Sequence, residues 1–160
     1  MGKAAEYLVA ASCILVTRGE LNVSTSMMDD EGVDLVFHRR GGSAALAVQV
    51  KARMSDTTVV KDERFVAQVR TQTFWPRENL DLLFVAIDVG CGAVMTAWLV
   101  PSDIFGDMVT GRTAQGHLRF AAPMKLGTAD RWSGYRLTAA QLPQRIMARL
   151  DDLEAACRAG

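Results

Sequence analysis

Two β-prone runs on either side of a glycine pair constrain the fold of this chain more than any other feature. Residues 33–39 and 44–53 are rich in branched apolar side chains, and the sequence RGGS separates them at positions 40–43. A Gly-Gly pair between such runs predicts a β-hairpin, because glycine adopts the positive φ angles of tight turns without strain. We therefore expect two adjacent antiparallel strands here.

The hairpin predicts which side chains share a face. A turn centred on the glycine pair places Asp34 opposite Gln49, and Lys51 follows two residues later on the same face. A carboxylate, an amide and an ammonium group therefore converge, and oxygen donors of this kind suit Mg²⁺ better than zinc. The other face is predicted to be the core side, because it receives only apolar side chains, from Val33, Leu35, Phe37, Leu46, Val48 and Val50.

An opening helix is expected to add a fourth group. Residues 4–18 are rich in alanine, contain no proline and end in Arg18-Gly19, a pattern that predicts a helix. Glu6 lies on a mostly small and apolar side of this helix. A carboxylate buried there needs a cation or a metal ion nearby. The alternative is that Glu6 only benefits from the positive end of the helix dipole.

With these residues in this order, the chain resembles the PD-(D/E)XK nuclease superfamily. The matching residues are Glu6 in the opening helix, Asp34 in the sequence EGVDLV at 31–36, and Gln49-Val50-Lys51 on the next strand. Members of the superfamily carry a helical Glu, a strand Asp and an acid-x-Lys motif. The chain looks closest to the small bacterial branch that has Gln-x-Lys instead, as in some intron homing endonucleases. Gln49 then stands where most members of the superfamily have a negatively charged metal ligand.

The resemblance covers about residues 2–100 and implies a Mg²⁺- or Mn²⁺-dependent endonuclease that hydrolyses DNA phosphodiester bonds. It implies that Glu6, Asp34, Gln49 and the Val50 backbone oxygen hold the metal ion, with Glu31 as a further candidate ligand. Lys51 would orient the attacking water or stabilise the developing negative charge. The implied catalytic residues are Glu6, Asp34, Gln49 and Lys51.

The fold class expected for the chain is α+β, with a restriction-endonuclease-like core in which a helix packs on a mixed β-sheet around the central hairpin. Residues 82–88 and 93–100 predict further strands, residues 65–75 fit either a strand or a helical turn, and residues 117–121 fit a strand. Ser102 is a candidate cap of a short helix. We expect a single domain over residues 1–160, with residues 101–160 as a C-terminal extension.

An amphipathic helix is expected to close the chain. Thr138 and Gln141 have the spacing of a capping box. The helix after them has an apolar stripe that we expect to pack within the chain, although it could instead pair two copies in a homodimer. The stripe consists of Leu142, Ile146, Leu150, Leu153 and Cys157.

Charge and composition limit the classes of partner. The formal net charge is zero, from 18 basic and 18 acidic residues, but residues 35–77 are basic overall and residues 78–111 contain no Lys or Arg. Such segregation can create a basic face that contacts DNA phosphates. Chance clustering on an ordinary surface is the alternative for each of the candidate contacts, which are Arg39, Arg40, Arg53, Arg64 and Arg70.

The remaining features favour a cytoplasmic protein. The three cysteines are widely spaced, which fits neither a disulfide framework nor a cysteine-ligated zinc site. His38 and His117 are expected to be ordinary strand residues. We expect no export signal and no membrane-spanning segment, because the apolar runs are too short. A catalytically inactive module of the same fold, binding nucleic acid or a protein partner, stays open as an alternative function.

Overall fold

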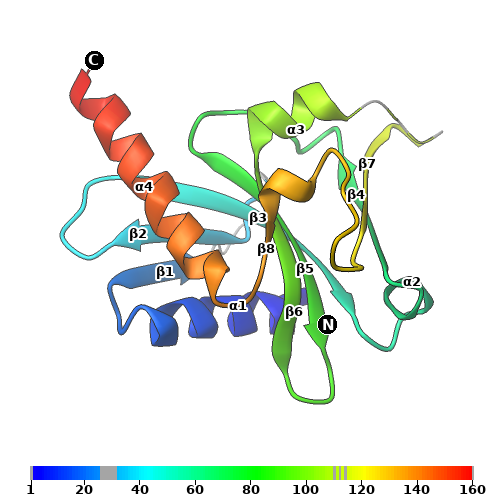
Figure 1. Ribbon diagram of the computed structural model, residues 1–160. Coiled ribbons are helices and arrows are strands. Elements are labelled where there is room, and N and C mark those ends of the chain that lie inside the picture. The colour runs from blue at the N-terminus through cyan, green and yellow to red at the C-terminus, as the bar shows by residue number, and fades with distance from the viewer. Residues whose placement is uncertain (1, 26–31, 110, 112, 114, 160) are drawn as a thin grey trace.

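The computed structural model describes residues 2–25, 32–109, 111, 113 and 115–159. It contains a six-stranded sheet, a separate two-stranded sheet and flanking helices, which confirms the expected α+β class (Figure 1). No described helix has the length and apolar character needed to cross a membrane. The elements are α1 (Gly2–Val16), β1 (Leu21–Thr25), β2 (Leu35–Arg39), β3 (Ala45–Met54), α2 (Thr58–Lys61), β4 (Arg64–Arg70), β5 (Leu80–Asp88), β6 (Ala93–Pro101), α3 (Ser102–Met108), β7 (His117–Pro123), η1 (Ser133–Tyr135), β8 (Arg136–Leu137) and α4 (Gln141–Ala159).

The six-stranded sheet is mixed and has the order β1-β2-β3-β5-β6-β8. Strand β3 pairs antiparallel with β2 on one side and parallel with β5 on the other. Because parallel strands need a crossover connection, the chain leaves this sheet after β3 and forms α2 and β4 before it returns as β5. Strand β4 pairs antiparallel with β7, and we call this two-stranded sheet the ribbon.

The predicted hairpin register is confirmed. Leu35 faces Val48 and Phe37 faces Leu46, the alignment that continues to Asp34 opposite Gln49. Strand β2 nevertheless begins at Leu35 rather than at Val33, which is only half-buried.

Both faces of the sheet are covered. The apolar face of the hairpin, including Leu35, Val48 and Val50, packs in one cluster with buried residues of α1 and α4, as expected. The ribbon and α3 cover the opposite face through a second cluster rich in aromatic rings. Strand β5 alternates between the two clusters, which explains its unbroken apolar sequence. The face that carries Gln49 and Lys51 is therefore turned toward the ribbon instead of open solvent.

The closing helix forms largely as predicted. Gln141 N donates to Thr138 Oγ1 at 3.3 Å and Thr138 N donates to Gln141 Oε1 at 2.9 Å, so the capping box is present. Ser102 is not a cap, because its hydroxyl binds the backbone of Arg77. Cys157 lies outside the buried stripe, since the last turns of α4 extend past the sheet and leave it exposed. The rest of the stripe is buried: Leu142, Ile146, Leu150 and Leu153.

Candidate active site

Asp34 lies at the edge of β3, where β2 begins. The Val50 backbone N–H donates to Asp34 Oδ2 at 2.7 Å. The carboxylate therefore accepts the hydrogen bond that a backbone carbonyl would accept if β2 extended further along β3. The N–H and C=O groups of one strand residue point toward the same edge. The Val50 carbonyl therefore points to the edge of β3 at which Asp34 lies, as the resemblance implied for a backbone ligand.

Glu6 faces inward from α1, as one of the two sequence interpretations required. Its side chain is 8% exposed, and Lys3 Nζ donates to Glu6 Oε2 at 2.8 Å. Lys3 also interacts electrostatically with Asp34. The Lys3 ammonium thus supplies positive charge to both carboxylates, although its own side chain is 62% exposed.

The pKa of Asp34 is raised above that of an ordinary aspartate. Burial is the largest cause and the nearby Glu6 carboxylate raises the pKa further, while the Val50 N–H, Lys51 and Lys3 act in the opposite direction. A divalent cation bound beside Asp34 would favour its ionised form and so offset the effects of burial and of the Glu6 carboxylate.

We expect Asp34→Asn to raise the melting temperature at pH 7. Because the folded-state pKa of Asp34 is raised, the folded protein binds this proton more tightly, and stability falls as pH rises through the interval above the ordinary value of 3.8. Asparagine keeps an oxygen that accepts from Val50 but carries no charge. Thermal melts without metal at pH 7 and pH 3 measure the effect. A gain of equal size at both pH values would contradict the charge argument.

A pocket of about 430 Å³ opens between β3 and the ribbon. Gln49 and Lys51 line it from β3, whereas Glu6 and Asp34 are not part of the lining. Asp34 is nevertheless close enough to Lys51 for the ammonium to lower its pKa. The other lining residues are Gly32, Gln68, Arg70, Thr73 and His117.

Gly32 leaves the space that the Gln49 amide occupies. Its φ is +66°, and a Cβ at this position would lie 2.6 Å from Gln49 Nε2 and 3.2 Å from the Thr73 carbonyl oxygen. Any side chain at residue 32 must therefore push the Gln49 amide away.

Gly32→Ala is expected to lower the DNA cleavage that the family resemblance implies by about 10²-fold, because small displacements of positioning groups have effects of this size. Gly92→Ala is the matched control, since Gly92 has φ +62° but open space around it. Initial cleavage rates and thermal melts of both variants separate loss of the site from loss of stability. Equal activities in the two variants would show that the Gln49 position does not matter.

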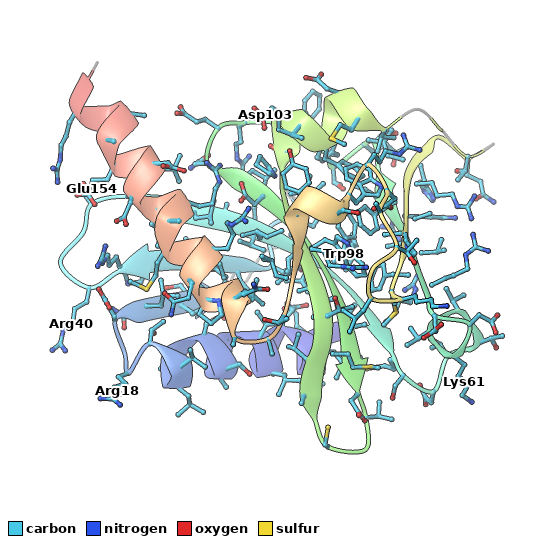
Figure 2. The ribbon with its side chains drawn as sticks, viewed as in Figure 1. Arg18, Arg40, Lys61, Trp98, Asp103 and Glu154 are labelled. Atoms are coloured by element: carbon cyan, nitrogen blue, oxygen red, sulfur yellow. The ribbon has the colours of Figure 1, made fainter. Side chains whose placement is uncertain are left out.

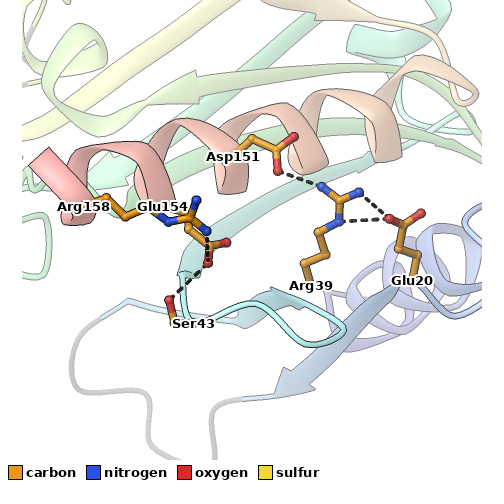
Figure 3. Close-up of polar contacts among 6 residues, drawn as sticks. All are labelled: Glu20, Arg39, Ser43, Asp151, Glu154 and Arg158. Atoms are coloured by element: carbon orange, nitrogen blue, oxygen red, sulfur yellow. Dashed lines mark hydrogen bonds and ion pairs between the residues drawn. The ribbon is translucent and has the colours of Figure 1, made fainter.

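Arg39 lies between two carboxylates and forms ion pairs with both. It donates to Glu20 at 2.9 Å and to Asp151 of α4 at 2.7 Å (Figure 3). Its guanidinium thus joins the end of β2 to α4. Its predicted contact with DNA stays a prediction.

The other four predicted arginines occupy different places. Arg70 lines the pocket, and Arg64 is exposed at the start of the same strand. Arg53 donates to the Val66 carbonyl at 2.9 Å and so joins β3 to β4. Arg40 lies in the hairpin turn, on the opposite side of the molecule from α2 and its Lys61 (Figure 2). The structure groups only Arg53, Arg64 and Arg70 around the ribbon.

Sequence reasoning missed three polar residues on the ribbon: Gln68, His117 and Arg119. Gln68 and His117 line the pocket, and Gln68 Oε1 lies 3.0 Å from His117 Nδ1. Arg119 faces Gln68 across the two strands. The polar and apolar alternation of residues 64–70 and 117–123 was the available signal, but nothing in it indicates that these two strands pair.

The donor set fits a hard divalent cation with few protein ligands. Among the described residues no group of three or more His, Cys, Asp or Glu side chains is close enough to hold a metal ion. Glu6 and Asp34 supply carboxylate oxygens, and the Val50 carbonyl is a backbone oxygen at the same edge. Mg²⁺ commonly binds through one or two carboxylates and keeps several waters. Glu31, the further candidate ligand, lies outside the described residues.

Comparisons with known proteins place the fold. No protein-family model matches the chain, and no curated protein matches its sequence. The structure is similar to that of the bacterial homing endonuclease I-Ssp6803I, with a TM-score of 0.53 and 18% sequence identity. The match covers 95% of this chain and 94% of that one. The chain therefore has the fold of a known endonuclease along nearly its whole length.

Proposed function

We propose that this protein is a metal-dependent endonuclease of the PD-(D/E)XK type that hydrolyses DNA phosphodiester bonds. The observation that carries the proposal is the Asp34 carboxylate, bound to the Val50 N–H, electrostatically coupled to Glu6 and close to Lys51. Structural similarity to a homing endonuclease supports the same class of reaction. The chain would act as a cytoplasmic enzyme on DNA.

Each site residue has a role in the proposed reaction that follows from its chemistry. Glu6, Asp34, Gln49 and the Val50 carbonyl would hold Mg²⁺ or Mn²⁺, which when bound polarises the scissile phosphate and lowers the pKa of an attacking water. Lys51 lies in the pocket, where its ammonium can orient the water and stabilise the negative charge that develops on phosphorus oxygens. Gly32 leaves room for the Gln49 amide, which lines the same pocket.

The basic side chains around the pocket would hold the substrate. Arg70 lines the pocket directly, Arg53 of β3 donates to the Val66 carbonyl of β4, and Arg64 lies at the other end of β4 from Arg70. Guanidinium groups bind phosphate oxygens without regard to sequence. Arg39 and Arg40 remain candidates for more distant phosphates.

The test is cleavage of supercoiled plasmid by the purified protein, followed by gel electrophoresis. Nicking is expected with Mg²⁺ or Mn²⁺ and none with EDTA. Activity that persists in EDTA would contradict the metal-dependent reaction.

One observation favours a second candidate, a nuclease fold that binds DNA without cutting it. The described residues offer only two carboxylates at the site, because Gln49 stands where an acid is common in the resembling family. For such a module, calorimetry would detect no Mg²⁺ binding, while salt-dependent affinity for DNA would persist.

A further inference from the structure

The ribbon is a rigid platform beside the pocket. It is separate from the six-stranded sheet, and its inner face is packed against that sheet by aromatic rings. Phe120 of β7 stacks on Phe84 of β5 with ring centroids 3.8 Å apart, and Phe65 of β4 lies 5.4 Å from the Trp98 ring of β6. The outer face of the ribbon is thus held in a fixed orientation.

Long hydrogen-bonding side chains occupy the outer face at the pocket end. Arg70 is paired with His117 and Gln68 with Arg119 in the register of the two strands. Arg70, Gln68 and Arg119 are exposed, and no described carboxylate forms an ion pair with either arginine. None of these four positions is acidic or lysine. Further along, the outward positions are Val66, Ala121, Arg64 and Pro123.

This combination of arginine, glutamine and histidine side chains suits hydrogen bonding to base edges better than contact with DNA phosphates alone. Arginine binds the guanine edge with two parallel hydrogen bonds, and glutamine does the same with adenine. Apolar side chains such as those further along the face contact the thymine methyl group. A two-stranded ribbon also fits within the major groove, which is about 12 Å wide.

The pocket connects this face to the proposed chemistry. Gln68, Arg70 and His117 line the same pocket as Lys51. If a DNA phosphate lies at Lys51, as the proposed function requires, the bases next to that phosphate come within reach of the ribbon side chains that line the pocket. We propose that the outer face of the ribbon reads base edges in the major groove of duplex DNA through Gln68, Arg70, His117 and Arg119, and so gives the enzyme sequence preference.

The experiment is a binding selection from duplex DNA with a randomised central segment, carried out with the full chain in EDTA. We expect the wild-type protein to enrich a defined sequence. Arg119→Ala and Gln68→Ala are expected to lose discrimination at one or two adjacent base pairs by about 5- to 150-fold, with the rest of the preferred sequence unchanged. Both positions are exposed, so thermal melts should match those of the wild type.

Arg18→Gln is the matched control, because it also removes an exposed positive charge but lies at the end of α1, away from the ribbon (Figure 2). It is expected to leave the selected sequence unchanged. A uniform loss of affinity in the ribbon variants with the same preferred sequence would overturn the proposal in favour of phosphate contacts. A wild-type protein that enriches no sequence would overturn it too.

Cleavage separates this inference from the proposed function. The selected duplex is incubated with wild-type protein and Mg²⁺. If a sequence is enriched but not cut, the nuclease proposal fails and base reading stands. If DNA is cut but the ribbon variants keep the wild-type preference, base reading fails and the nuclease proposal stands.

Discussion

Lys51→Ala is expected to lower the rate of DNA cleavage by about 10²- to 10³-fold without unfolding the protein. The ammonium lies in the pocket and acts electrostatically on Asp34. Removing a single group that stabilises charge in a transition state has an effect of this size. Initial rates of plasmid nicking in Mg²⁺, at matched protein concentration, measure it.

Lys61→Ala is the matched control for Lys51→Ala. Lys61 is an exposed lysine on α2 and does not line the pocket (Figure 2). Lys61→Ala removes the same charge and the same side-chain length as Lys51→Ala. Because the change lies outside the pocket, the activity of Lys61→Ala should stay close to that of the wild type. Asp34→Ala should be as inactive as Lys51→Ala. Cleavage that continues unchanged in both site variants would point to a contaminating nuclease or to another site.

Arg149→Met is expected to destabilise the fold by about 3–5 kcal/mol, the usual result of leaving a buried charge without its partner. Asp81 of β5 is fully buried, and both of its oxygens accept from Arg149 of α4 at 3.0 Å. Burial raises the pKa of Asp81, while Arg149 holds it down. Chemical denaturation of the wild type and the variant at pH 7 measures the loss.

A double variant separates the buried charge from simple loss of packing. In Arg149→Met combined with Asp81→Leu, no unpaired carboxylate remains, and replacing both partners by apolar groups is often neutral. We expect this protein to regain most of the stability lost in the single variant. A double variant less stable than Arg149→Met alone would mean that the ion pair itself stabilises the link between α4 and β5.

The hairpin and its register were predictable because every determinant is local. The Gly41-Gly42 turn and the apolar alternation on both sides allow one alignment, and the structure has it. The same local logic predicted the capping box at Thr138 and placed Glu6 on the opening helix, whereas Asp34 lies just before β2 and not on the strand that was expected to carry it. The metal and catalytic roles of these residues stay predictions.

Long-range pairing could not be predicted. Nothing within residues 64–70 or 117–123 indicates that these strands form a ribbon beside Lys51, so Gln68, His117 and Arg119 were missed. The partner of a charged residue could not be predicted either. Nothing in the sequence around Arg39 indicates that it binds Glu20 and Asp151. Single-sequence patterns specify faces of elements, while contacts between distant elements depend on how those faces pack.

The most direct measurement is the anomalous scattering of crystals soaked in Mn²⁺. We expect a peak within coordination distance of the Glu6 and Asp34 carboxylates and the Val50 carbonyl, and no such peak in Asp34→Asn crystals. A saturating soak that gives no manganese at these oxygens, or manganese only elsewhere on the protein, would contradict this expectation.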